Sequence, residues 1–203
     1  MNPYFRTPPV VKNLIIANTL IFLATWLLPQ AAIIADRFFA LYWFGSPLFH
    51  SYQYITYMFL HGGFGHLFFN MFALWMFGRT LEYELGSRRF IIYYLVCGVG
   101  AALIQMLVAW LTGDLGIVLI GASGAVMGVL LAFGVMHPNE VLIMFPIPVP
   151  VKAKWFVIGY AALELFYGAT GRAAGIAHFA HVGGMLWGYL LLLYWKRKGA
   201  IRY

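Results

Sequence analysis

The sequence has little charge and almost no cysteine. Only 9% of its 203 residues are charged and 63% are hydrophobic, whereas a soluble domain carries about 25% charged residues. A chain this apolar does not stay in solution as a monomer, so a soluble monomeric domain is excluded. The single cysteine, Cys97, excludes an intramolecular disulfide and every cysteine-rich metal site. The length suits one domain, residues 1–203, embedded in a membrane.

Long runs without charged residues predict where the chain crosses the membrane. A spanning helix needs about 20 mostly apolar residues. Six segments fit and predict an all-α membrane bundle, with spans at residues 13–33, 58–78, 90–112, 116–136, 155–171 and 175–195. An even number of spans places both termini on the same side of the membrane.

Two connections between these spans have unusual compositions. The uncharged run 38–78 is too long for one span. Its aromatic first part, Phe38–Gly45, is therefore predicted to be a loop that lies partly in the outer leaflet. After the fourth span, Pro146, Pro148 and Pro150 alternate with apolar residues. This spacing predicts an extended interfacial connector and excludes a helix.

The basic residues predict the orientation of the bundle. Eleven of the thirteen lie on the side of the termini, and only Arg37 and Arg172 lie on the other side. This bias predicts cytoplasmic termini. The net charge of +7 then indicates contact with anionic membrane lipids, and nucleic acid is not expected as a partner. A short core without a further span favours a bacterial inner membrane, and the oligomeric state stays open.

Polar residues inside the predicted spans mark candidate functional positions, because polar groups are costly in a bilayer. His66 and Asn70 lie four residues apart early in the second span, so they share one helix face. Ser123 lies early in the fourth span, and His178 and His181 lie early in the sixth. Because these three spans run inward, we expect the three clusters at similar depths below the outer surface.

Glycine pairs predict how the fourth and sixth spans pack. Gly124 and Gly128 follow Ser123, and Gly184 and Gly188 lie in the sixth span. Such pairs let two helix backbones approach closely in lipid. This packing puts the Ser123 hydroxyl within reach of an imidazole of the sixth span, and a serine with an adjacent histidine is the minimum for nucleophilic acyl transfer. The histidine and asparagine of the second span are candidate donors to the oxyanion.

Other functions use some of the same residues. A haem or metal protein would use His61, His66, His178 and His181, but the serine and the glycine pattern would be unexplained. The sequence has no His-Glu-x-x-His motif, which argues against a membrane zinc protease. A transporter would use Glu164, the one acid inside a predicted span, yet no internal repeat is evident. Glu164 is instead expected to hydrogen-bond a neighbouring helix or to extend to the interface.

Taken together, these motifs resemble the rhomboid family of intramembrane serine proteases. The resemblance runs from about Tyr54 to Gly188. It rests on four motifs: His-x-x-x-Asn at 66–70, Gly-x-x-x-Glu-x-x-x-Gly at 78–86, Gly-x-Ser-Gly at 121–124 and Ala-His-x-x-Gly-x-x-x-Gly at 180–188. In this order and spacing the motifs are highly specific.

The resemblance implies a role for each motif residue. Ser123 would be the nucleophile and His181 the general base, in a dyad with no aspartate. His66, Asn70 and the backbone N–H of Ser123 would form the oxyanion hole, supported by the motif glycines, which are Gly121, Gly124, Gly128, Gly184 and Gly188. Neither a cofactor nor a metal is implied. The substrates would be single-span membrane proteins whose helix unwinds near the outer surface.

The resemblance also implies features of the fold and leaves two alternatives. The site would face a water-filled cavity, and Gly116–Ala122 would enter the membrane as a non-helical loop. His178 also follows an alanine but lacks the glycine of the motif, so His181 is favoured as the base. The alternative function is an inactive relative that binds membrane clients, although such proteins usually lack the serine or the histidine.

The sequence departs from the family pattern in two places. Rhomboids commonly carry an aromatic residue four positions after the serine, against which the histidine packs, and here this residue is Met127. Methionine can also pack against an imidazole. The first loop lacks the Trp-Arg pair of many relatives, so the sequence does not indicate what holds this loop in place.

Overall fold

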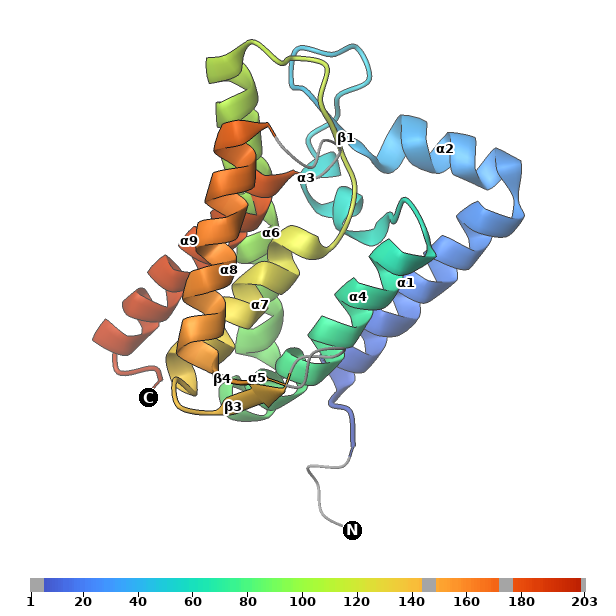
Figure 1. Ribbon diagram of the computed structural model, residues 1–203. Coiled ribbons are helices and arrows are strands. Elements are labelled where there is room, and N and C mark those ends of the chain that lie inside the picture. Colours follow the sequence, from blue (N-terminus) through green and yellow to red (C-terminus); the bar gives the residue numbers. More distant parts are fainter. Residues whose placement is uncertain (1–5, 144–148, 172–176, 202–203) are drawn as a thin grey trace.

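The computed structural model describes residues 6–143, 149–171 and 177–201 and is mostly helical (Figure 1). Its α-helices are α1 (Pro9–Leu27), α2 (Pro29–Phe39), α3 (Gln53–Thr56), α4 (Phe64–Ala73), α5 (Arg79–Leu85), α6 (Ser87–Thr112), α7 (Ser123–Met136), α8 (Ala153–Thr170) and α9 (His178–Arg197). A 3-10 turn covers Tyr57–Phe59 and a π-helical segment covers Leu74–Gly78. The short strands are β1 (Leu41–Tyr42), β2 (Val118–Leu119), β3 (Val141–Ile143) and β4 (Pro150–Lys152).

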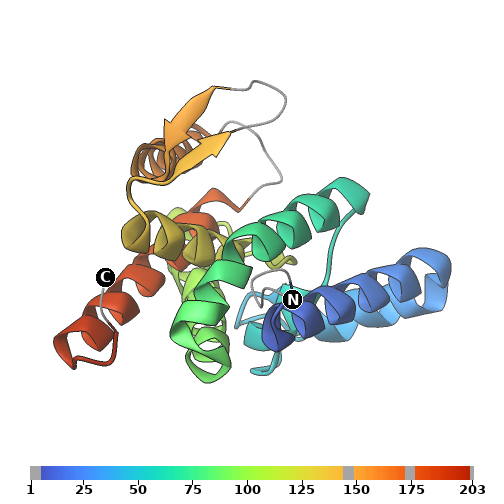
Figure 2. The same cartoon turned by 90° about the horizontal axis from the view of Figure 1, so that it is seen from below.

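Helices α6, α7 and α9 form the centre of the molecule. Figure 2 shows them between two flanks, with α8 and the β3–β4 hairpin on one side and α1 and α2 on the other. In Figure 1, α1 begins and α9 ends in the lower half of the view, at the end opposite α2. The start of α7 therefore lies in the interior of the bundle, between the two flanks.

Only part of the predicted span pattern is visible in the helix lengths. Among the described residues, α1 and α6 are long and apolar enough to cross a membrane, and α7 is a shorter apolar helix. The all-α character of the prediction is confirmed, apart from the two short strand pairs. The number of six spans stays a prediction.

The first two predicted spans have different boundaries in the structure. The segment 13–33 contains a helix break, because Leu28 is extended and Pro29 begins α2. Proline favours the first position of a new helix, since its missing N–H needs no partner there. The segment 58–78 starts as a 3-10 turn and loop, and its helix begins only at Phe64. That helix then continues through the π-helical segment to Leu85.

The first loop is held by contacts that the sequence did not indicate. β1 pairs antiparallel with β2, with Leu41 opposite Leu119, and β2 lies four residues before Ser123. The fully buried Gln53 side chain donates to the carbonyl of Leu48 at 2.9 Å and accepts from the backbone of His50 at 3.1 Å. The loop is therefore tied to the segment that leads into the predicted nucleophile.

The connector after α7 begins with a turn at residues 137–140 and is extended in its two strands. β3 and β4 pair antiparallel, and Pro150 is the first residue of β4. Pro146 and Pro148 lie outside the described residues. Residues 175 and 176, the first two of the sixth predicted span, also lie outside them.

Candidate active site

The Ser123 hydroxyl lies against an imidazole of α9. Its Oγ is 2.8 Å from Nε2 of His181, a hydrogen-bond distance. Ser123 is the first residue of α7, and His181 lies in the first turn of α9. The two residues are 58 positions apart in the sequence, so helix packing alone brings them together.

Close packing of glycines brings α7 and α9 together. A Cβ atom at Gly184 would overlap with the backbone carbonyl of Gly124, and a Cβ at Gly128 would overlap with the Cys97 side chain. Gly188 packs against the Tyr93 hydroxyl in the same way, and that hydroxyl donates to the Gly128 carbonyl at 2.8 Å. Gly184 is needed because the backbones of α7 and α9 touch there, whereas Gly128 and Gly188 make room for side chains of α6.

Gly121 shapes the approach of the chain to Ser123. Its φ of +118° lies in a region that favours glycine, and its N–H donates to the Tyr57 carbonyl at 2.9 Å. A Cβ at Gly121 would lie 2.7 Å from Cε1 and Nε2 of His66 and 3.8 Å from the Ser123 Oγ. The His66 ring therefore borders the space next to the serine.

His66 presents a ring nitrogen to this space. The N–H of Gly62 points at Nδ1 of His66 at 3.4 Å, so Nδ1 is the acceptor in this contact, which assigns the proton of the neutral ring to Nε2. Nε2 is the atom that borders Gly121. Asn70 is buried one turn further along α4. The second-span residues thus lie on one helix face, and His66 has a donor on the Ser123 side.

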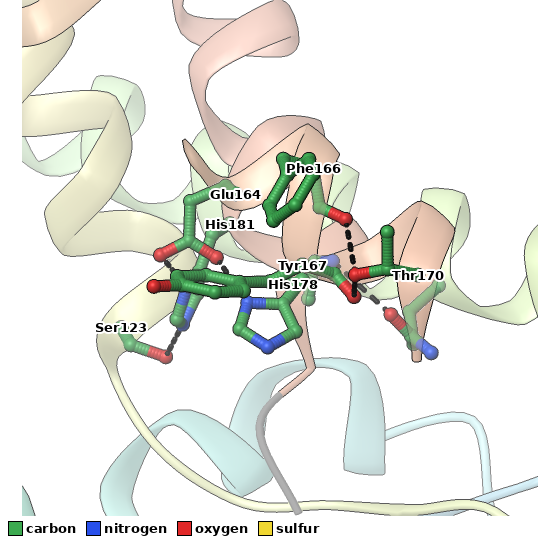
Figure 3. Close-up of polar contacts among 9 residues, drawn as sticks. Ser123, Glu164, Phe166, Tyr167, Thr170, His178 and His181 are labelled. Carbon is green, nitrogen blue, oxygen red and sulfur yellow. Dashed lines mark hydrogen bonds and ion pairs between the residues drawn. The ribbon is translucent and has the colours of Figure 1, made fainter. Parts of the chain in front are cut away.

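Glu164 is the unexpected member of the site. This residue of α8 is buried, and its Oε2 lies 2.6 Å from Nδ1 of His178 while its Oε1 lies 3.0 Å from Nδ1 of His181 (Figure 3). The expected hydrogen bond from Glu164 to a neighbouring helix is therefore confirmed, and the side chain does not extend to the interface. The sequence indicated Glu164 as an acid inside an apolar helix, but it did not indicate that two histidines are its partners.

The two histidines of α9 have different partners. His181 has one ring nitrogen near Ser123 and the other near Glu164, whereas Nδ1 of His178 is directed to Glu164. The ring of His178 also lies 5.6 Å from the Tyr167 ring and 6.4 Å from the His181 ring. The His178 ring is therefore an edge-on neighbour of the His181 ring.

Glu164, His178 and His181 have the residue types of a metal site, and their ligand atoms lie within 4.8 Å of one another. Ligands of a tetrahedral zinc ion bind at about 2.0–2.2 Å, so neighbouring ligand atoms lie about 3.3 Å apart. The separation of 2.6 Å between Glu164 and His178 is shorter and fits a charge-assisted hydrogen bond. The arrangement therefore fits hydrogen bonding better than metal binding.

A cavity near the site lies on its α1 side. It has a volume of about 370 Å³, and its lining includes His61, Gly62 and Ile120 together with residues of α1 and α2. Ser123 and His181 are not among its lining residues within the described chain. The expected cavity at the serine itself therefore stays a prediction.

Comparisons with known proteins identify the family. The family model "Rhomboid domain" matches residues 48–198. Rhomboid protease AarA of Providencia stuartii is 31% identical over 69% of this chain and 54% of its own length. Rhomboid protein 1, mitochondrial, of Saccharomyces cerevisiae is 32% identical over 92% of this chain and 54% of its own length. Putative rhomboid protease YdcA of Bacillus subtilis is 30% identical over 75% of this chain and 71% of its own length.

The relatives also bear on size and location. The chain spans 54% of the yeast protein and 59% of Rhomboid-like protein 11, chloroplastic, of Arabidopsis thaliana. Since the relatives include mitochondrial and chloroplastic proteins, the expectation of a bacterial inner membrane is not supported. The match over residues 48–198 and the identities of 30% or more show that this chain is a membrane-embedded member of the rhomboid family.

Proposed function

We propose that the chain is an intramembrane serine endopeptidase in which Ser123 is the nucleophile and His181 the general base. The observation that carries this proposal is the 2.8 Å contact between the Ser123 Oγ and the His181 Nε2 across α7 and α9. A serine next to a histidine base is the arrangement that nucleophilic acyl transfer requires. Two relatives carry the word protease in their names, which supports the same reaction class.

The reaction proceeds through an acyl-enzyme. The Ser123 Oγ forms a bond to the scissile carbonyl carbon as its proton passes to Nε2 of His181, and the carbonyl π electrons move to the oxygen. When the tetrahedral intermediate collapses, the C–N bond breaks and the leaving amine takes the proton from His181. Water then attacks the ester carbon and gives a proton to His181. The bond between the ester carbon and the Ser123 Oγ breaks, Oγ takes that proton from His181, and the acid product leaves.

The oxyanion is stabilised from two sides. The Ser123 N–H is at the start of α7, where the first N–H groups of a helix have no partner within the helix. The Nε2–H of His66 borders the same space from α4, and Asn70 follows one turn later. Donors arranged in advance around a developing negative charge are usually the largest contribution to such catalysis.

The proposed setting is a bundle of six membrane crossings with cytoplasmic termini. The crossings are α1, α4 with its extension to Leu85, α6, α7, α8 and α9, and the start of α1 and the end of α9 at one end of the molecule support an even number. The substrates are single-span membrane proteins, with lipid around the bundle. Their helix must unwind at the cut, because a helical backbone engages its carbonyls in hydrogen bonds.

The test is cleavage and covalent labelling in liposomes. Wild type, Ser123→Ala, His181→Ala and His178→Ala are reconstituted with a fluorophosphonate probe and a single-span substrate that has a helix-destabilising segment. We expect wild type to react with the probe and to cleave the substrate. We expect Ser123→Ala and His181→Ala to have a kcat that is lower about 10⁴-fold or more. Ser87→Ala is the matched control, since Ser87 hydrogen-bonds Glu82 at the start of α6 and not the dyad.

Three outcomes separate the hypotheses. Equal labelling of wild type and Ser123→Ala would exclude Ser123 as the nucleophile. Loss of cleavage in His178→Ala but not in His181→Ala would move the base to His178. A wild type that neither labels nor cleaves would contradict the protease and favour a relative that binds membrane clients.

A further inference from the structure

We propose that Glu164 is a positioning residue for His181, so that Ser123, His181 and Glu164 work as a triad whose carboxylate comes from α8. The inference rests on the proposed function, because it assigns a role within the same reaction. The family resemblance implied a dyad with no aspartate. The geometry points to a third member because the Glu164 carboxylate lies at the ring nitrogen of His181 that faces away from Ser123.

The carboxylate bridges both histidines of α9. Its Oε2 accepts a 2.6 Å hydrogen bond from Nδ1 of His178, and its Oε1 lies 3.0 Å from Nδ1 of His181. Figure 3 shows Glu164 above the two rings, with the Ser123 hydroxyl on the far side of His181. Each carboxylate oxygen of Glu164 therefore has its own imidazole, and one of the two is the imidazole that contacts Ser123.

The contact fixes which nitrogen of His181 carries the proton. To accept the proton of Ser123, Nε2 must be unprotonated, which leaves the proton on Nδ1. Nδ1 is the atom that faces Glu164. A negative oxygen at this position favours the Nδ1–H form, and it also stabilises the imidazolium that forms as Ser123 attacks.

The contact between Glu164 and His181 acts through charge more than through an aligned hydrogen bond. The two atoms are at ion-pair distance, while Nδ1 of His181 has no partner in hydrogen-bond geometry among the described residues. Catalytic hydrogen bonds are often poorly aligned in free enzymes and tighten when substrate binds. The charge of the carboxylate is therefore the property to remove in a test.

His178 makes the buried carboxylate tolerable. Glu164 is only 5% exposed, and an unpaired carboxylate is costly inside a membrane protein. The short bond from His178 satisfies one oxygen. The ring of His178 is itself packed against Tyr167 of α8, which holds the donor in place. His178 thus supports Glu164, which in turn orients His181.

The decisive variant is Glu164→Gln, which keeps the size of the side chain and removes its charge. We expect kcat on the single-span substrate to fall about 10²-fold, with KM unchanged within twofold and fluorophosphonate labelling slowed to a similar degree. The matched control is Glu82→Gln, which changes another buried glutamate whose partners lie at the opposite end of the molecule. This control is expected to keep kcat within about twofold.

A second measurement does not depend on turnover. In protein labelled with ¹⁵N-histidine, one-bond proton couplings show which ring nitrogen of His181 carries the proton, with His181→Ala providing the assignment. We expect the Nδ1–H form in wild type and in Glu82→Gln, and a growing share of the Nε2–H form in Glu164→Gln. A wild-type Nε2–H form contradicts the proposal whether or not Glu164→Gln folds.

The outcomes separate this inference from the proposed function. If wild type cleaves and His181→Ala does not, but Glu164→Gln has the kcat of Glu82→Gln, the protease stands and the triad is refuted. If Glu164→Gln raises KM with an unchanged kcat, Glu164 has a structural role only, which also refutes the triad. A wild type without cleavage or labelling contradicts the proposed function itself.

Discussion

Two buried glutamates, Glu82 and Glu164, show how the same side chain is used at the two ends of this protein. Glu82 is 2% exposed, and it accepts hydrogen bonds from the backbone N–H groups of Val10 and Val11 and from the Ser87 hydroxyl. Glu164 is 5% exposed, and its partners include two imidazoles. The partners of Glu82 act only as hydrogen-bond donors, whereas an imidazole can both donate and accept a proton.

These different partners indicate a structural role for Glu82 and a role in the proposed reaction for Glu164. Glu82 is a residue of α5, and its carboxylate lies at the start of α1. The N–H groups of Val10 and Val11 have no partner within that helix, and a negative charge is favourable there. It therefore joins α1 to α5 and α6 without taking part in a reaction. Glu164 lies beside a histidine that contacts a serine, so its charge acts on the proposed general base.

The largest expected effect is a difference in kcat between alanine variants of the two histidines next to Glu164. His181→Ala removes the base and should lower kcat about 10⁴-fold or more. His178→Ala leaves the base and removes the support of Glu164, so kcat should fall only about 10-fold. The measurement is kcat in liposomes at saturating substrate, with both proteins checked for folding by circular dichroism. An equal fall in kcat in the two variants would contradict the assignment of His181 as the base and His178 as the support of Glu164.

A smaller effect on kcat is expected at the contact between Gly184 and Gly124, which holds α9 against α7. Gly184→Ala places a methyl group against the Gly124 carbonyl and should push α9 away from α7. We expect the free energy of unfolding to fall by about 1–3 kcal/mol and labelling of Ser123 to slow. Gly63→Ala is the control, because no atom lies within 4 Å of a Cβ there. A Gly184→Ala protein with normal labelling would show that the contact does not set the Ser123–His181 distance.

A change at Glu82 is expected to lower the stability of the protein and to leave kcat unchanged. Glu82→Gln weakens charge-assisted hydrogen bonds to Val10 and Val11, so the free energy of unfolding should fall by about 2 kcal/mol. Hydrogen exchange at these two amides should accelerate, while kcat stays near the wild-type value. A fall in kcat similar to that of Glu164→Gln would contradict the division between the two glutamates.

The smallest effect is expected at Gln53, which resembles Glu82 in having backbone partners but is uncharged. Gln53→Ala removes its bonds to Leu48 and His50 and should cost about 1 kcal/mol in loop stability. The readout is faster proteolysis of residues 38–57 by an added soluble protease, with Gln30→Ala, at the exposed start of α2, as the control. Unchanged proteolysis would show that the pairing of β1 with β2 holds the loop without Gln53.

Several features could be predicted because they depend on local composition. The long apolar α6 follows from an uncharged run, and the extended connector follows from alternating prolines. The break at Leu28 was missed, since an apolar run hides a single proline that begins a second helix. The extension of α4 to Leu85 was missed because charged residues normally end a span, and here the helix continues past Arg79.

The amino-acid sequence by itself determined that the chain belongs in a membrane, which residues are polar inside it, and that glycines of two segments allow close packing. These properties follow from side-chain chemistry and from spacing along a helix. The tertiary structure decided which polar groups meet: Ser123 with His181, and both histidines with Glu164. The physical reason is that each contact joins different helices, whose relative positions depend on packing across the whole bundle and not on any local pattern.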